Sequence, residues 1–135
     1  MYIHFFGDGR DTAPRSATKY IGQLQDFLKE QGVGEISTVV GRYFAMDRDK
    51  RWDRVKIAVD GLVQGKGDKV ESGSDLIKTI EKGYESDITD EFIKPIICGS
   101  EGSRIQSESL SSWHTIAAND QRVTLSSVST TDLTE

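Results

Sequence analysis

Hydrophobic residues in the first part of the chain alternate between short β-rich runs and helical repeats. The run Tyr2–Phe6 has the composition of a strand and ends at a Gly-Asp-Gly turn signal. Pro14 favours a helix start soon afterwards, with Ser16 as a possible cap, and apolar residues then recur at helical spacing at Tyr20, Ile21, Leu24, Phe27 and Leu28. Gly32 ends this helix, and the β-branched run Ile36–Val40 predicts a second buried strand.

The same alternation continues to about residue 97. We expect a helix from Trp52 to about Gln64, with one apolar face made of Val55, Ala58, Val59 and Leu62. A polar loop over 65–73 follows, and a third helix ending near Gly83 is marked by Leu76, Ile77, Ile80 and Tyr84. The run Phe92–Ile97 predicts another strand, in which Pro95 indicates an edge position or a strand end.

The order of these elements predicts the fold class. A strand, a helix and a strand within about 40 residues form the βαβ pattern, which favours a parallel sheet with a right-handed crossover. We therefore expect an α/β fold with a mostly parallel sheet and flanking helices. Because the first strand begins at Tyr2, we expect a partial domain from a longer chain.

The end of the chain has a different character. From Ser103 to Glu135, 13 of 33 residues are Ser or Thr, and neither a helical nor a strand period can be followed. The sequence therefore predicts two parts, an ordered domain over 1–104 and an irregular Ser/Thr-rich tail over 105–135.

Composition and charge exclude several classes of partner. The 17 Lys and Arg against 22 Asp and Glu give a net charge of −5, which argues against a nucleic-acid binder. No apolar run approaches the roughly 20 residues that span a membrane, so we expect no membrane partner. The single cysteine, Cys98, cannot form an internal disulfide, which indicates a reducing, cytoplasmic location.

Two loops are candidates for chemistry because each follows a predicted strand, where α/β sheets place their ligands. They are residues 7–12 and 41–52, and both present arginine after a glycine-containing turn. From Arg42 to Arg54, five basic residues stand against three acidic ones. Planar guanidinium groups suit the capture of carboxylate or phosphate. The alternative is a solvated charge run with local ion pairs at the start of a helix.

Other conspicuous residues have simple structural interpretations. His4, inside an apolar strand, is expected to be a core or structural histidine, and Cys98 an inert buried thiol because no histidine or helix start adjoins it. Trp52, Tyr43 and Phe44 are expected to line the core or a loop wall rather than to stack on a ligand.

Three strings in the sequence resemble the cofactor-independent phosphoglycerate mutases. They are HFFGDGRDT at 4–12, GRYFAMDRDKRW at 41–52 and TDEF at 89–92. The likeness runs from about Tyr2 to Arg104. Residues from 107 onward depart from the family pattern, so the tail is not expected to be family sequence.

The resemblance implies a function for a longer protein. Complete members are two-domain cytoplasmic enzymes, typically monomeric, that interconvert 3-phosphoglycerate and 2-phosphoglycerate in glycolysis and glucose catabolism, through a phosphoserine and with two Mn²⁺. This chain resembles only the inserted domain, which holds the glycerate, so we expect it to bind no metal and to be inactive as an isomerase alone.

Four positions match the family's substrate residues. By motif, the resemblance assigns phosphoglycerate binding to Arg10, Asp11, Arg42 and Arg48, with Asp11 as a candidate general acid or base. Three guanidinium groups suit a ligand that carries a carboxylate and a phosphate. The alternative is a non-catalytic anion-binding or regulatory module that derives from the mutase.

The tail generates a prediction about its origin. Degenerate back-translation of Trp113–Gln121, read in a shifted frame, permits a Tyr-Arg-Ser-Glu-Arg string that fits the family pattern. We expect transcript sequencing to show a frameshift or a misjoined exon boundary near residue 107. An uninterrupted frame across 107–122 in RNA would count against this origin.

Overall fold

The computed structural model describes residues 2–105, 111–115 and 124–128. The chain divides into two compact units, Met1–Arg104 and Ile105–Glu135. No helix in the described ranges is long and apolar enough to cross a membrane.

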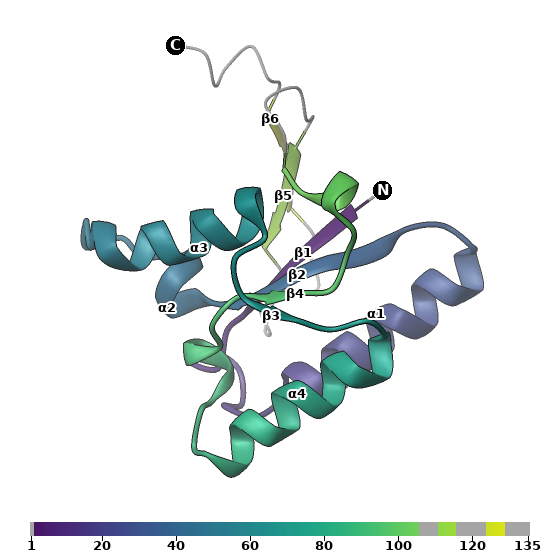
Figure 1. Cartoon of the computed structure of the whole chain (residues 1–135), viewed down its shortest axis with the longest axis horizontal. Helices are drawn as coiled ribbons and strands as arrows, with labels where there is room; N and C mark the ends of the chain where they lie inside the picture. The colour runs from purple at the N-terminus through teal and green to yellow at the C-terminus, as the bar shows by residue number, and fades with distance from the viewer. Residues whose placement is uncertain (1, 106–110, 116–123, 129–135) are drawn as a thin grey trace. The chain divides into compact units, whose positions relative to one another are not determined.

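The first unit is built on a four-stranded sheet (Figure 1). Its strands are β1 (Tyr2–Gly7), β2 (Glu35–Gly41), β3 (Asp68–Lys69) and β4 (Ile96–Ile97), in the order β1-β2-β4-β3. Strands β1 and β2 pair in parallel, as do β3 and β4, whereas β2 and β4 are antiparallel. The predicted mostly parallel α/β fold is thereby confirmed, with one antiparallel pairing in the middle of the sheet.

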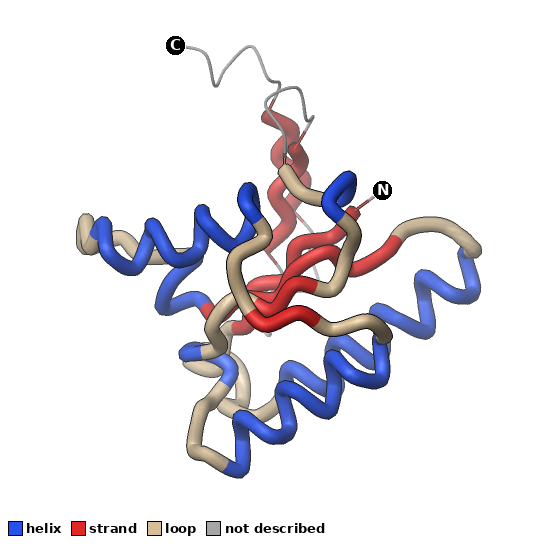
Figure 2. Tube along the Cα trace, in the orientation of Figure 1, coloured by secondary structure: helices blue, strands red, loops and turns tan. Residues whose placement is uncertain are grey.

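Helices cover both faces of this sheet (Figure 2). Helices α1 (Ala17–Gln31) and α4 (Gly73–Glu85) lie side by side on one face. Helices α2 (Arg42–Ala45) and α3 (Trp52–Gln64) lie on the other, and two 3-10 turns, η1 (Asp90–Phe92) and η2 (Glu101–Ser103), complete the unit. The central strands β2 and β4 are therefore buried, whereas β1 is only partly covered and β3 is exposed.

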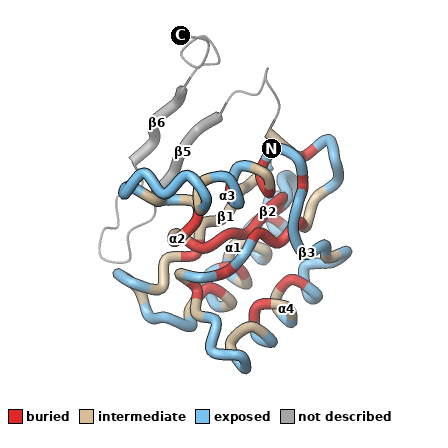
Figure 3. Tube along the Cα trace, turned by 60° about the vertical axis from the view of Figure 1, so that its left-hand side comes forward, coloured by how far each residue is buried: buried red, intermediate tan, exposed pale blue. Residues whose placement is uncertain are grey.

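The core has two parts, one on each face of the sheet (Figure 3). Under α1 and α4, the larger cluster has Ile21, Val39 and Leu76 almost completely buried. Under α2 and α3, the smaller one is made of Val40, Phe44 and Ala58. Removing such apolar surface from water is the main favourable contribution to folding.

A shift of register between β1 and β2 places His4. Ile3 pairs with Ile36, but His4 pairs with Thr38, so one residue of β2 has no opposite partner. The His4 ring nitrogen Nδ1 shares a hydrogen bond with the Thr38 hydroxyl at 2.8 Å. Burial lowers the pKa of His4, which keeps the ring neutral near pH 7. His4 is a structural histidine, as predicted.

The structure corrects three expectations about helices and strands. The predicted strand Phe92–Ile97 is only Ile96–Ile97, because 90–92 form the 3-10 turn η1 and Pro95, which has no N–H, stands immediately before the strand. The predicted polar loop over 65–73 contains β3, whose two residues are polar and exposed and so carry no hydrophobic signal. The third helix ends at Glu85, past Gly83.

The burial of several side chains differs from what the sequence predicts. Phe44 is buried, but Trp52 is 71% exposed and does not line the core. Val59 of α3 is also exposed, because the buried face of that helix is centred on Ala58 and Leu62. Cys98 is half-buried, and burial raises its pKa to about 12, so the thiol is un-ionised and inert at neutral pH.

The second unit contains a two-stranded antiparallel ladder. Strand β5 (Ser111–Thr115) pairs with β6 (Thr124–Val128). The irregular tail predicted from the sequence is wrong for these two segments, because a ladder of backbone hydrogen bonds does not require a regular alternation of apolar side chains. The remainder of the predicted tail, 106–110, 116–123 and 129–135, lies outside the described residues.

A buried aspartate, Asp90, caps helix α1 from a distant part of the chain. Only 1% of Asp90 is exposed, and its Oδ2 accepts the backbone N–H groups of Ser16 at 2.9 Å and Ala17 at 2.8 Å. Its Oδ1 accepts the Tyr84 hydroxyl, and its own N–H donates to the Pro14 carbonyl at 2.9 Å. Ser16 occupies the N-cap position, as predicted, but its hydroxyl donates to the Ala13 carbonyl at 2.7 Å instead of accepting a helix N–H.

The environment of Tyr84 follows from this contact. Burial first, and then the hydrogen bond to the Asp90 carboxylate, raises the pKa of the Tyr84 phenol well above its usual value. The hydroxyl therefore remains a donor at all physiological pH values. Asp90 thus joins α1, α4 and the loop before α1.

We predict that Asp90→Asn lowers the free energy of unfolding by about 2 kcal/mol, because the buried acceptor loses its charge and gains donors without partners. Asp87→Asn is the matched control, since the Asp87 side chain is exposed and forms an ion pair with Arg15 at 2.9 Å. Chemical denaturation of the full chain measures both. Equal stability of the two variants would contradict the capping role of Asp90.

Candidate functional site

The parallel pairing of β1 and β2 brings the two predicted loops together. Gly7, the last residue of β1, is directly opposite Gly41, the last residue of β2. Asp8 and Arg42 therefore leave the sheet at the same edge. This edge, at the carboxyl ends of two parallel strands, is where the sequence predicts the ligand.

Close packing against η1 holds both loops in place. A Cβ on Gly7 would lie 2.7 Å from the Asp90 carbonyl oxygen, and one on Gly41 would overlap the Glu91 carbonyl. Gly9 has a positive φ of 68°, and a Cβ there would lie 2.8 Å from the Glu91 nitrogen. The Gly41 N–H also donates to the Ile93 carbonyl at 2.7 Å. Only glycine permits these approaches.

Three of the charged side chains meet at this edge. Arg42, the first residue of α2, donates from NH1 to Asp8 Oδ1 at 2.5 Å and to Asp11 Oδ2 at 2.9 Å. The Arg42 side chain is 19% exposed, that of Asp8 is 23% exposed and that of Asp11 is 71% exposed. Arg42 and Asp8 thus form the sheltered part of the cluster, and Asp11 lies at its solvent side.

Electrostatics favour the charged forms of the Arg42–Asp8 pair. Partial burial acts to raise the pKa of Asp8, but the hydrogen bond from Arg42, two backbone N–H groups and the Arg42 charge outweigh it, so the pKa is lowered overall. The hydrogen bonds from its guanidinium to Asp8 and then to Asp11 raise the pKa of Arg42. The site therefore contains a fixed positive charge at neutral pH.

The other two predicted site residues are exposed. Arg10 stands in the same loop as Asp8, and its backbone N–H donates to Asp8 Oδ1 at 3.2 Å. Arg48 is exposed in the loop after α2. Within the described ranges, neither guanidinium forms an ion pair, so both are available to an anion.

Two residues of the charged segment 42–54 form a local ion pair at the start of a helix, which is the alternative interpretation of that segment. Asp47 has a side chain only 2% exposed, accepts the backbone N–H of Arg51 at 2.8 Å and lies 3.6 Å from NH1 of Arg54. Arg54 also lies 3.8 Å from the centre of the Tyr43 ring. Tyr43 belongs to α2 and packs against the smaller core cluster, which is one of the two places predicted for it. Asp47 and Arg54 support the start of α3.

Sequence reasoning missed Asp8. Its Oδ1 accepts the backbone N–H groups of Arg10 and Asp11, both at 3.2 Å, in addition to the Arg42 guanidinium. An aspartate between two glycines at the end of a strand is typical of a turn held by a side-chain oxygen, and that signal was available.

The described residues do not suit the two Mn²⁺ that the resemblance implies for a complete enzyme. Asp8 and Asp11 both accept hydrogen bonds from Arg42, which competes with a cation for the same oxygens. No group of three or more His, Cys, Asp or Glu side chains in the described ranges could hold a metal ion.

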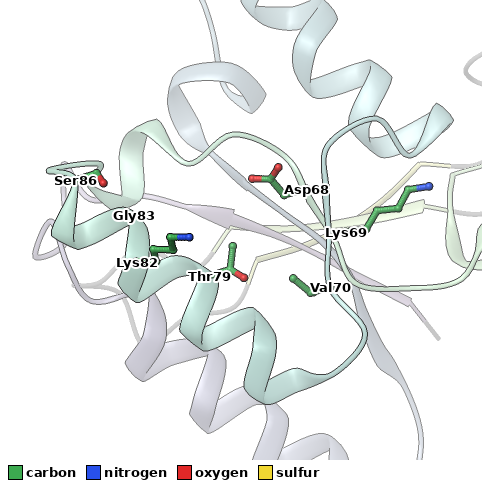
Figure 4. A pocket seen from close by; sticks show the side chains of 7 residues that line it. All are labelled: Asp68, Lys69, Val70, Thr79, Lys82, Gly83 and Ser86. Carbon is green, nitrogen blue, oxygen red and sulfur yellow. The ribbon is translucent and has the colours of Figure 1, made fainter.

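Hollows elsewhere on the first unit lack this chemistry. One, of about 500 Å³, lies between β3 and α4 and is lined by Asp68, Lys69, Val70, Thr79, Lys82, Gly83 and Ser86 (Figure 4). Its polar side chains are those of a solvated surface, and it contains none of the predicted site residues.

Fold and site together define an α/β domain that presents a cluster of arginine and aspartate side chains at the ends of two parallel strands. Residues 1–113 match the family described as the BPG-independent PGAM N-terminus. The chain belongs to this family, and the resemblance seen in the sequence is confirmed.

Individual relatives agree with this assignment. The chain is 51% identical over 104 residues to the 2,3-bisphosphoglycerate-independent phosphoglycerate mutase of Onchocerca volvulus and 48% identical over 102 residues to that of Clostridium botulinum. These matches cover 76% of this chain and 20% and 19% of the relatives. The chain therefore spans about a fifth of their length.

A solved structure has a similar fold. The phosphoglycerate mutase of Leishmania mexicana superimposes with a TM-score of 0.64 at 27% identity, over 76% of this chain and 20% of that one.

We predict that the Asp8 carboxyl titrates below 3.8, the ordinary value for aspartate, because the ionised form is held by Arg42. Its contribution to stability is then complete above about pH 4 and is lost as the pH falls through the lowered pKa. Carbon-detected NMR of the full chain measures the midpoint. In Arg42→Ala the midpoint rises; an unchanged midpoint would mean that Arg42 does not set it.

Proposed function

We propose that this chain is the phosphoglycerate-binding part of a 2,3-bisphosphoglycerate-independent phosphoglycerate mutase, an isomerase of glycolysis. The observation that carries the proposal is the Arg42 guanidinium, held at the end of β2 with its NH1 group paired to Asp8 and Asp11. Family membership supports it, because relatives that match this chain are phosphoglycerate mutases.

The charges of the site suit a ligand with two anionic groups. Arg42 supplies a fixed, partly sheltered charge, and Arg10 and Arg48 supply two exposed guanidinium groups on the flanking loops. A planar guanidinium binds a carboxylate or a phosphate through two parallel hydrogen bonds. In the proposal these three residues orient the glycerate and its phosphate, which is the larger part of catalysis in phosphoryl transfer.

Asp11 is the candidate general base of the proposal. A carboxylate accepts the hydrogen bond of a glycerate hydroxyl, and Asp11 is the exposed carboxylate of the cluster. Its Oδ2 accepts a hydrogen bond from NH1 of Arg42 at 2.9 Å. For a proton transfer, Asp11 must therefore exchange Arg42 for the substrate hydroxyl.

A role as a binding module without catalysis is the second candidate. The chain covers about a fifth of the length of the relatives, and the arginines that this candidate needs, Arg10, Arg42 and Arg48, are all within it. Both candidates require 3-phosphoglycerate to bind, and they differ in turnover.

We predict that the full chain binds 3-phosphoglycerate and that Arg42→Ala weakens binding about tenfold or more, the effect of losing a charge-assisted hydrogen-bond pair. Calorimetry measures the affinity, and an enolase-coupled assay measures turnover in the same sample. Arg15→Ala is the matched control, because Arg15 also pairs with an aspartate, at an exposed position away from the cluster.

Glycerol 3-phosphate, which lacks the carboxylate, tests whether the site binds both anionic groups of 3-phosphoglycerate. We expect it to bind more weakly than 3-phosphoglycerate. Binding without turnover supports the module, and turnover supports an isomerase. Equal affinity of Arg42→Ala and the unaltered chain would contradict the proposed site.

A further inference from the structure

Asp8 contacts three of the four residues to which substrate binding is assigned. A single oxygen, Oδ1, accepts the backbone N–H groups of Arg10 and Asp11 at 3.2 Å each and the NH1 group of Arg42 at 2.5 Å. Arg10 and Asp11 belong to the loop after β1, whereas Arg42 begins α2 after β2. Asp8 is therefore the side chain that joins the two loops.

The two carboxylates on Arg42 differ in their surroundings. Asp8 is 23% exposed and forms three hydrogen bonds through one oxygen, but Asp11 is 71% exposed and accepts from Arg42 alone with its side chain. An exposed ion pair costs little to exchange, whereas a sheltered carboxylate with three donors is costly to move. Asp8 is the lasting partner of Arg42, and Asp11 the replaceable one.

Both carboxylates bind the same nitrogen of the Arg42 guanidinium, NH1. NH1 carries two hydrogens, and Asp8 and Asp11 accept one each. Nε and NH2 of Arg42 donate to no protein group in the described ranges. The side of the guanidinium group that these two nitrogens form is therefore open to a ligand. A guanidinium held by NH1 has a fixed plane, and a fixed plane is what two parallel hydrogen bonds to an anion require.

We propose that Asp8 is a positioning residue for phosphoglycerate binding: it fixes the plane of Arg42 and the backbone of Arg10 and Asp11, and so presents the three residues to the ligand in one arrangement. This inference rests on the proposed function. It assigns to Asp8 no contact with the substrate.

A simple counter-charge would behave differently. If Asp8 acted only through its charge, its removal would leave Arg42 more positive and tighten the binding of every anion. Asparagine separates the two roles, because Asn at position 8 keeps the oxygen that accepts the three N–H groups but has no charge. Alanine removes both.

The experiment measures binding of 3-phosphoglycerate and of inorganic phosphate to the full chain and its Asp8→Ala and Asp8→Asn variants by calorimetry. We expect Asp8→Ala to weaken 3-phosphoglycerate about tenfold and inorganic phosphate less than threefold, because free phosphate needs no fixed arrangement of several groups. Asp8→Asn stays within about threefold of the unaltered chain for both anions. Circular dichroism confirms that each variant is folded.

A second readout reports on Arg42 itself and needs no ligand. The ¹⁵N relaxation of the Arg42 Nε–H group measures the order of the side chain on the picosecond to nanosecond timescale. We expect order to fall in Asp8→Ala and to persist in Asp8→Asn. Asp11→Ala is the matched control, in which the lasting Asp8 contact keeps Arg42 ordered.

Distinct results overturn the two claims. Tighter binding of both anions by Asp8→Ala and Asp8→Asn, or an Arg42 that stays ordered in Asp8→Ala, overturns the positioning role and leaves the proposed function standing. Failure of the unaltered chain to bind 3-phosphoglycerate overturns the proposed function, and the positioning role with it.

Discussion

The buried carboxylate of Asp90 is the contact on which the arrangement of the first unit depends. Its two oxygens accept hydrogen bonds from the backbone at the start of α1 and from the Tyr84 hydroxyl of α4. Its backbone N–H donates to the Pro14 carbonyl. The turn it begins, η1, is also the surface against which Gly7, Gly9 and Gly41 pack. A buried acceptor whose oxygens are surrounded by donors is costly to dislodge, so the helices and both site loops share one anchor.

The same anchor fixes the two loops of the candidate site within an acidic chain. The whole chain carries a net charge of −5, but the loops that carry Arg10 and Arg42 begin opposite each other at the ends of β1 and β2, and Arg48 follows in the loop after α2. Asp8 holds Arg42 from the sheltered side, and Asp11 meets it from the solvent side. Under the proposed function, an incoming anion would compete chiefly with the exposed Asp11 carboxylate, and the loops would need little reorganisation to receive it.

The sequence predicts what local patterns encode and misses what distant contacts decide. Periodicity and turn signals predict β1, α1, β2 and the two loops at one edge, because these features depend on neighbours in the chain. Asp90 was not foreseen as a cap, since 74 positions separate it from Ser16. Strand β3 was missed because its polar residues pair only through the backbone, and the role of Asp8 became visible only when the register placed Gly7 beside Gly41. Family motifs, not spacing, assigned Arg10 and Arg48.

The most direct test of a shared anchor is native-state hydrogen exchange of four backbone amides: Ser16 and Ala17, which donate to Asp90, Asp90 itself, and Gly41, which donates to Ile93. If η1 holds both loops and the start of α1 as one unit, these amides open with the same free energy and the same dependence on denaturant. If the Gly41 amide opens at a much lower free energy than those of Ser16 and Ala17, the loops are anchored separately and the account is contradicted.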